Sequence, residues 1–171
     1  TSVADSASLG ALKGARGNSG VILSQILRGF AKGLKGDIKT MQAEHLALAA
    51  EKGVEAAYKA VMKPQEGTIL TIARSLSDEA NICLKAGDDV LVMLKKMLHG
   101  GEEMLKRTPD MLPVLKEAGV VDAGGEGLLV IYRGFLAVLN GEKIEDIVLE
   151  APESVADFDL ITGNEDIEFA Y

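Results

Sequence analysis

Three short segments of this chain combine turn-forming residues with an immediately following apolar stretch. They are residues 14–20 (GARGNSG), residues 64–68 (PQEGT) and residues 119–127 (GVVDAGGEG). Glycine allows backbone conformations closed to other residues and lets a ligand approach the chain closely. The first amides of a helix have no intrahelical acceptor and lie at the positive end of its dipole. These three junctions therefore predict sites where helix starts could bind phosphate.

The first junction carries the most informative pattern. The amides of Asn18, Ser19 and Gly20 would lie at the start of a helix, and Arg16 and Lys13 would add positive charge. The spacing matches neither GxxxxGK[ST] nor a strand-preceded GxGxxG. The same residues also fit a tight turn between helices in which Ser19 is the N-cap. Both interpretations stay open at this point.

The other two junctions each offer one polar side chain. Asp122 could accept hydrogen bonds from a ribose or orient a phosphate-bound group, and it could equally be the N-cap of the next helix. Thr68 likewise fits a simple N-cap.

Helices are the elements that must position these junctions, because apolar residues recur at steps of three and four. The pattern predicts six helices, with caps at Thr40 and Asp88, and shows no strand up to residue 141. The predicted helices cover residues 21–35, 40–62, 68–87, 88–105, 108–119 and 126–139.

Short connections between these helices predict an all-α fold, an antiparallel up-and-down helical barrel or bundle. Because helix direction alternates in such a bundle, the helices that start near Val21 and Thr68 should both start at the same end. The start near Glu126 joins them if residues 108–119 are too short to span the bundle. Three helix N-termini would then converge on one mouth, which suits a polyphosphate.

Composition and charge divide the chain into two parts. Residues 141–171 hold ten acidic residues against Lys143 alone, which leaves residues 1–140 of the −8 chain at a formal +1. We expect a helical nucleotide-binding domain over residues 1–141, and an acidic linker with the beginning of a following domain over residues 142–171. The first 36 residues are basic and would favour an anion. Their charged side chains after Ser6 are Lys13, Arg16, Arg28, Lys32 and Lys35.

Several classes of protein do not fit this sequence. No apolar run reaches the ~18 residues of a membrane span, and Cys83 cannot form an internal disulfide, so we expect a cytoplasmic protein. Cys83 fits a core position. His45 and His99 lack the partners of a zinc site. Nucleic-acid binding is not expected without a basic face interleaved with aromatic residues.

The junctions resemble the DhaL-like domain of dihydroxyacetone kinases and, more closely, the amino end of fatty acid kinases. The matching stretches are GARGNSGVILSQILRGFAKGL, YKAVMKPQEGTIL and VLKEAGVVDAGGEGLLVIYRGFL. The resemblance implies an eight-helix antiparallel barrel with ADP or ATP at one end and two magnesium ions on the phosphates. It places Asn18 and Ser19 against the phosphates.

The same resemblance implies the rest of the nucleotide site. Thr68 and Ile69 would line the pocket, and Thr108 is a weaker match for a contact near the adenosine. The turn Asp122, Ala123 and Gly124 would contact the nucleotide. No residue is predicted to be catalytic, because positioning and electrostatics do most of the work in phosphoryl transfer.

The sequence departs from the family in one respect. The family holds its metals on an Asp-Gly-Asp-Thr-Gly type of segment before the glycine-rich loop, whereas Asp5 is the one acidic residue among residues 1–36. Magnesium requires several oxygen ligands in near-octahedral geometry. We therefore expect no metal ligand in this chain and place the ligands upstream of Thr1. On this interpretation the chain is a fragment whose barrel is open on one side.

The resemblance implies a kinase that transfers the γ-phosphoryl group of ATP to a fatty acid held by a carrier protein. The fragment alone would be inactive, and a homodimer is possible. Two alternatives remain at this stage. One is the nucleotide-binding subunit of a dihydroxyacetone kinase, and the other is a non-catalytic helical interaction module whose glycine turns serve packing only.

Overall fold

The computed structural model describes residues 3–36 and 38–142, and every regular element among them is a helix. The first of the chain's two units, Thr1–Gly141, contains every described helix. The predicted acidic linker and the start of a following domain, residues 142–171, lie outside the described residues except for Glu142. The eight helices are α1 (Val3–Gly14), α2 (Gly17–Gly33), α3 (Ala43–Lys59), α4 (Ile69–Ala86), α5 (Val90–Lys106), α6 (Thr108–Met111), α7 (Pro113–Ala118) and α8 (Ala123–Leu139).

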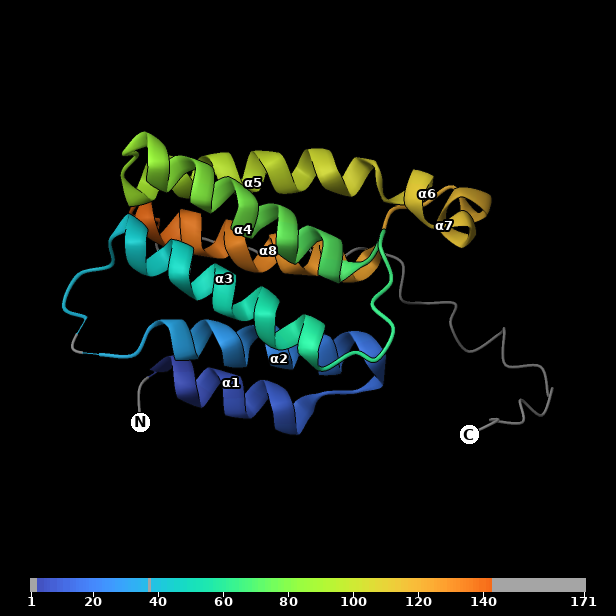
Figure 1. Ribbon diagram of the computed structural model, residues 1–171, viewed down its shortest axis with the longest axis horizontal. Coiled ribbons are helices and arrows are strands. Elements are labelled where there is room, and N and C mark those ends of the chain that lie inside the picture. Colours follow the sequence, from blue (N-terminus) through green and yellow to red (C-terminus); the bar gives the residue numbers. More distant parts are fainter. Residues whose placement is uncertain (1–2, 37, 143–171) are drawn as a thin grey trace. The chain divides into compact units, whose positions relative to one another are not determined.

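Within the first unit, each long helix from α1 to α4 runs antiparallel to the next one along the chain, and short connections join them (Figure 1). Helix α1 packs on α2, α2 on α3, α3 on α4, and α4 on α5. Helix α8 packs on α4 and α5, and its Phe135 stacks on Phe30 of α2 with 6.1 Å between ring centroids. The predicted all-α antiparallel architecture is confirmed.

The core consists mainly of aliphatic and methionine side chains from α4, α5 and α8. Its largest fully buried apolar side chains are Leu70, Ile72, Leu76, Met93, Leu94, Met97, Leu128 and Leu129. Burying an aliphatic side chain of this size is worth about 1.5–3 kcal/mol, so this cluster is the main source of stability. Cys83 is fully buried in the same cluster, as predicted, and burial raises the pKa of its thiol.

Helices α2 and α3 approach each other through glycine rather than through large side chains. Gly29 faces the carbonyl of Lys52, and a Cβ added at Gly33 would lie 2.5 Å from the Cα of Ala49. No side chain fits at either glycine, so the two backbones pack directly. This close packing holds α2 firmly against the rest of the unit.

The structure differs from the sequence prediction at several helix ends. Helix α1 was not predicted, and it buries no residue. Helix α3 begins after Gln42, which forms a capping box with His45, rather than after Thr40. The predicted helix over residues 108–119 is two short helices, because the extended residue Leu112 separates them and Pro113 opens α7.

Candidate functional site: a junction of three helix starts

The first turns of α2, α4 and α8 meet at one end of the unit (Figure 1). A Cβ added at Gly124 would lie 3.6 Å from Ser19 Oγ and 3.3 Å from both Ile69 Cβ and Asp122 Oδ2. The predicted meeting of the three helix starts is therefore confirmed. It occurs because α6 and α7, with 4 and 6 residues, are too short to span the bundle. We call Ser19, Ile69, Asp122 and Gly124 the helix-start junction.

Helix α2 enters this junction without a side-chain cap. Its N-cap residue is Arg16, in an extended conformation, and Gly17 follows with φ +62°. The alternative in which Ser19 is the N-cap is wrong, because Ser19 lies inside the first turn. The amides of residues 17–19 have no acceptor within the helix, and these residues are exposed. This turn therefore offers backbone donors to a ligand.

The guanidinium of Arg16 does not cap α2. Its Nη1 donates to the carbonyl oxygens of Ala15 at 2.8 Å and Lys13 at 3.5 Å. Arg16 thus donates hydrogen bonds to carbonyl groups at and just after the end of α1. Its positive charge stays on the turn that leads into α2.

Helix α4, in contrast, carries its own cap. The hydroxyl of Thr68 accepts a hydrogen bond from the Leu70 amide at 3.4 Å and donates one to the Gln65 carbonyl at 2.7 Å. The N-cap interpretation of Thr68 is confirmed. Ile69, the first residue of α4, is buried against Gly124, so its side chain forms an apolar wall of the junction.

Helix α8 is capped by Asp122, whose Oδ2 accepts from the Gly125 amide at 2.6 Å. This N-cap interpretation is also confirmed. Burial raises the pKa of Asp122, and hydrogen bonds from the Gly125 and Ile69 amides oppose that rise only in part. The carboxylate therefore links the starts of α8 and α4, and its charge would be stabilised by a hydroxyl donor or a cation.

Thr108 supports the turn that contains Asp122. Its side chain is fully buried, and its hydroxyl donates to the Leu105 carbonyl at 2.7 Å. The same oxygen accepts from the Asp122 amide at 3.1 Å. Sequence reasoning missed this link, since the two residues are 14 positions apart. Thr108 holds Asp122 in place.

In the part of the chain that the structure describes, the junction lacks the ligand cluster of a magnesium site. Among residues 3–36 and 38–142 there is no group of three His, Cys, Asp or Glu side chains that could hold a metal ion. Asp122 already accepts a hydrogen bond from the Gly125 amide, so it offers little of the oxygen shell that magnesium requires.

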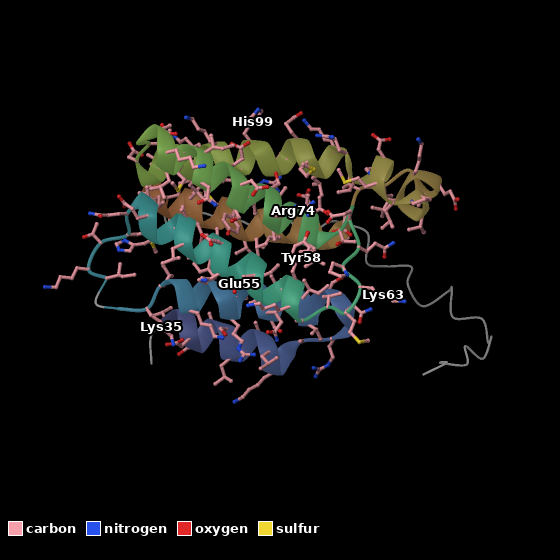
Figure 2. The ribbon with its side chains drawn as sticks, viewed as in Figure 1. Lys35, Glu55, Tyr58, Lys63, Arg74 and His99 are labelled. Atoms are coloured by element: carbon pink, nitrogen blue, oxygen red, sulfur yellow. The ribbon has the colours of Figure 1, made fainter. Side chains whose placement is uncertain are left out.

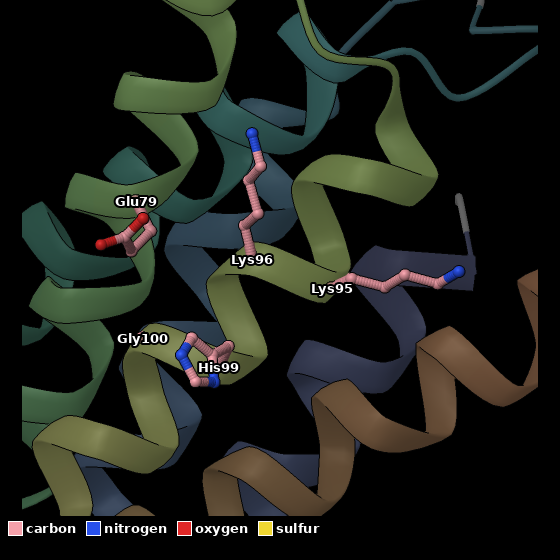
Figure 3. Close-up of a pocket in the computed structure, with 5 residues that line it drawn as sticks. All are labelled: Glu79, Lys95, Lys96, His99 and Gly100. Atoms are coloured by element: carbon pink, nitrogen blue, oxygen red, sulfur yellow. The ribbon is translucent and has the colours of Figure 1, made fainter.

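A separate hollow of about 310 Å³ lies between α4 and α5 (Figure 3). It is lined by Glu79, Lys95, Lys96, His99 and Gly100. The Lys96 ammonium is paired with Asp88 at 2.6 Å. None of these residues belongs to the helix-start junction, so the hollow is a different feature of the surface.

Comparison with known proteins assigns the class of this unit. Residues 1–137 match the DAK2 domain, and the chain therefore belongs to the DAK2 domain family. The DAK2 domain is a DhaL-like nucleotide-binding domain. The resemblance drawn from the three junctions is confirmed at this level. Among the described residues, no helix is long and apolar enough to cross a membrane.

Similar proteins occur in Bacillus and Staphylococcus species. The chain is 45% identical to protein YloV of Bacillus subtilis (strain 168) over 176 residues, covering 99% of the chain and 32% of YloV. It is 46% identical to an uncharacterized protein of Staphylococcus saprophyticus over 173 residues, covering 96% and 30%. An uncharacterized protein of Staphylococcus aureus (strain MRSA252) gives 46% over 169 residues, covering 96% and 31%. The chain spans about a third of the length of these relatives.

Proposed function

We propose that the helix-start junction binds the phosphates of ATP or ADP, with the backbone amides of Asn18, Ser19 and Gly20 against them. One observation carries this proposal. Helix α2 begins with exposed amides and no side-chain cap, directly beside the capped starts of α4 and α8. An anion is the partner that such a turn favours, because it satisfies the donors and the helix dipole together.

Residues at the starts of α4 and α8 contact the rest of the nucleotide in this proposal. Thr68 and Ile69 present the start of α4, and the turn from Asp122 through Ala123 to Gly124 presents the start of α8. The raised pKa of Asp122 reflects a partly buried charge, which a ribose hydroxyl would stabilise by donating a hydrogen bond. Thr108, the weaker match for a contact near the adenosine, supports this turn by accepting a hydrogen bond from the Asp122 amide.

For the whole protein we propose a kinase whose acceptor is a fatty acid presented by a separate carrier protein. A carboxylate oxygen of the fatty acid would form a bond to the γ-phosphorus while the bond to the β–γ bridging oxygen breaks. The products are an acyl phosphate and ADP. Because the acceptor is already ionised, no side chain of this chain has to act as a base. The resemblance implies that magnesium ions would neutralise the phosphate charge in this reaction.

Isothermal titration of ADP into the full-length protein, with and without Mg²⁺, tests the nucleotide site. The double replacement Ser19→Val and Gly20→Val should fill the turn and weaken ADP binding at least about tenfold, which corresponds to ~1.4 kcal/mol. Its melting temperature should change much less, because Ser19 is exposed and a Cβ at Gly20 would come no nearer than 3.4 Å, to Ala15 Cα. Equal losses of affinity and stability would identify a purely structural turn, and no ADP binding by the unaltered protein would favour an interaction module.

The acceptor needs its own experiment. Full-length protein supplied with ATP should form an acyl phosphate from a carrier-bound fatty acid and should leave dihydroxyacetone unphosphorylated. The reverse preference would replace the fatty acid proposal by the small-sugar one while leaving the nucleotide site intact.

A further inference from the structure

Glu66, in the segment between α3 and α4, is bound by side chains from both helices. Tyr58 of α3 donates to its Oε1 at 3.2 Å, and Thr71 of α4 donates to its Oε2 at 2.6 Å. Arg74 donates to both oxygens, at 2.9 and 2.7 Å, and its guanidinium lies 5.7 Å from the Tyr58 ring centroid. Figure 2 shows Tyr58 and Arg74 on neighbouring helices. We call these four residues the Glu66 clamp.

The carboxylate of Glu66 has no free capacity for a ligand. Each oxygen accepts two hydrogen bonds, which uses about four acceptor sites, the full number a carboxylate offers. Burial raises the pKa of Glu66, but hydrogen bonds from Thr71, Arg74 and Tyr58 outweigh it and hold the pKa below its usual value. Glu66 therefore stays ionised and fully engaged within the chain.

The clamp continues directly into the start of α4. The Gly67 amide donates to Thr71 Oγ1 at 2.9 Å, and Gly67 has φ +80°. On the other side, a Cβ added at Gly67 would lie 3.0 Å from the Cβ atoms of Met111 and Leu112. The chain just before Thr68 is thus held between the clamp and the segment that begins with α6.

Solvent exposure indicates what the clamp contributes. The side chains of Arg74 and Glu66 are 45% and 44% exposed. Ion pairs as exposed as this one contribute little to stability, typically below about 1 kcal/mol. A bidentate Arg–carboxylate pair still fixes geometry, because its two parallel hydrogen bonds allow one orientation. The clamp is therefore better suited to orient the α4 start than to stabilise the fold.

We propose that Glu66 is a positioning residue of the nucleotide site: it holds the α4 start, with Thr68 as its cap and Ile69 against Gly124, in place at the junction. This inference rests on the proposed function. Glu66 touches no ligand in it, and acts through Gly67 and Thr71.

A matched pair of variants tests this role in the full-length protein. Glu66→Gln removes the negative charge and replaces one carboxylate oxygen by an NH2 group, which cannot accept from Arg74. Glu102→Gln does the same to an ion pair of similar exposure, in which Arg133 Nη2 lies 3.0 Å from Glu102 Oε1 with side chains 42% and 40% exposed. Glu102 lies on α5 and belongs to no helix start of the junction.

ADP affinity should separate the two variants. We expect Glu66→Gln to weaken ADP binding about tenfold, because small misplacements of a binding group have large effects. Glu102→Gln should leave affinity unchanged, and the two melting temperatures should fall by similar amounts. Amide hydrogen exchange at Ile69 and Leu70 should quicken in Glu66→Gln alone.

If Glu66→Gln does not fold, Tyr58→Phe provides the same comparison, since it removes one donor and keeps the aromatic ring beside Arg74.

The outcomes distinguish the positioning role of Glu66 from the proposed nucleotide binding on which it rests. If the unaltered protein binds ADP and both variants change affinity equally, the clamp is structural and the inference is overturned while the nucleotide site stands. If the unaltered protein does not bind ADP, the proposed function fails and the inference fails with it.

Discussion

The two glycine-rich junctions, residues 14–20 and 119–127, look alike in sequence but use glycine for different physical reasons. At the start of α2, Gly17 has φ +62°, and an added Cβ would meet no atom within 4 Å. At the start of α8, an added Cβ on Gly125 would lie 2.5 Å from Ile72 Cγ1. Glycine supplies a backbone conformation in the first case and empty space in the second.

The two junctions also differ in what they leave available. Asp122 closes the start of α8 by accepting from the Gly125 amide, whereas α2 begins with no side-chain cap. A ligand that seeks backbone donors is therefore expected at α2, while α8 presents the surface of Gly124 beside it. Similar glycine patterns should not be given similar roles until the neighbours of each glycine are known.

Gly125→Ala should produce the largest effect on stability. The new methyl group would press on Ile72 and Leu105 in the core, and overpacking of this kind costs about 1–3 kcal/mol. The gain in helix propensity, up to ~1 kcal/mol, offsets it only in part. Urea unfolding measures the difference.

Gly127→Ala is the control for this change, because a Cβ at Gly127 meets no atom within 4 Å. The control should be neutral or slightly stabilising. If the two variants lost equal stability, Gly125 would not be packed as described, and the contrast between the junctions would weaken.

The helix starts show how far the sequence could predict this fold. Thr68 is an N-cap type followed by an apolar run, so the start of α4 was predicted closely. The start of α8 was predicted near Glu126, three residues late, although Asp122 was correctly considered as its cap. The start of α2 was predicted at Val21, four residues late, because Arg16 is not an N-cap type and a Gly-Asn-Ser-Gly turn does not resemble a helix. The missing cap that hid this helix start is the feature that makes it a candidate site.

Gly17→Ala should have the next largest effect. A left-handed conformation costs a residue with a Cβ about 1–2 kcal/mol, although no steric clash occurs here. To avoid that strain the first turn of α2 would rearrange and move the Asn18 and Ser19 amides. We expect a modest fall in melting temperature together with weaker ADP binding. Unchanged affinity would indicate that this turn does not touch the nucleotide.

Gly124→Val should reduce ADP affinity more than stability. Its branched side chain would enter the space between Ser19 Oγ and Ile69 Cβ, where the three helix starts meet. We expect about a tenfold loss of ADP affinity, or ~1.4 kcal/mol, measured by titration calorimetry. The smaller Gly124→Ala change should fall between Gly124→Val and the unaltered protein. A graded loss would show that the junction is part of the binding surface.

Two other features could not be predicted from the chain, for separate physical reasons. Helix α1 buries no residue, so it lacks the apolar stripe that reveals a helix packed on a core. The Glu66 clamp joins α3 to α4, and Glu66 and Arg74 lie eight residues apart with no helical register between them. Their pairing depends on how the segment before α4 turns, which the structure alone reveals. Contacts between two helices of this kind leave no pattern in the sequence of either helix.

Asp122→Asn should have the smallest effect, visible as a change in pH dependence. Burial raises the pKa of Asp122 above its ordinary value of 3.8, so the folded state binds its proton more tightly than the unfolded state. Stability from this group is therefore present below pH 3.8 and falls as pH rises through the higher folded pKa. Asn cannot titrate but can still accept from the Gly125 amide. The stability of the unaltered protein minus that of the variant should decrease from pH 3 toward neutrality.

In saturating ADP this decrease should shrink, because a ribose hydroxyl donating to Asp122 would favour its charged form. An unchanged decrease would argue against that contact and would leave Asp122 as a cap alone, in contrast to the open start of α2.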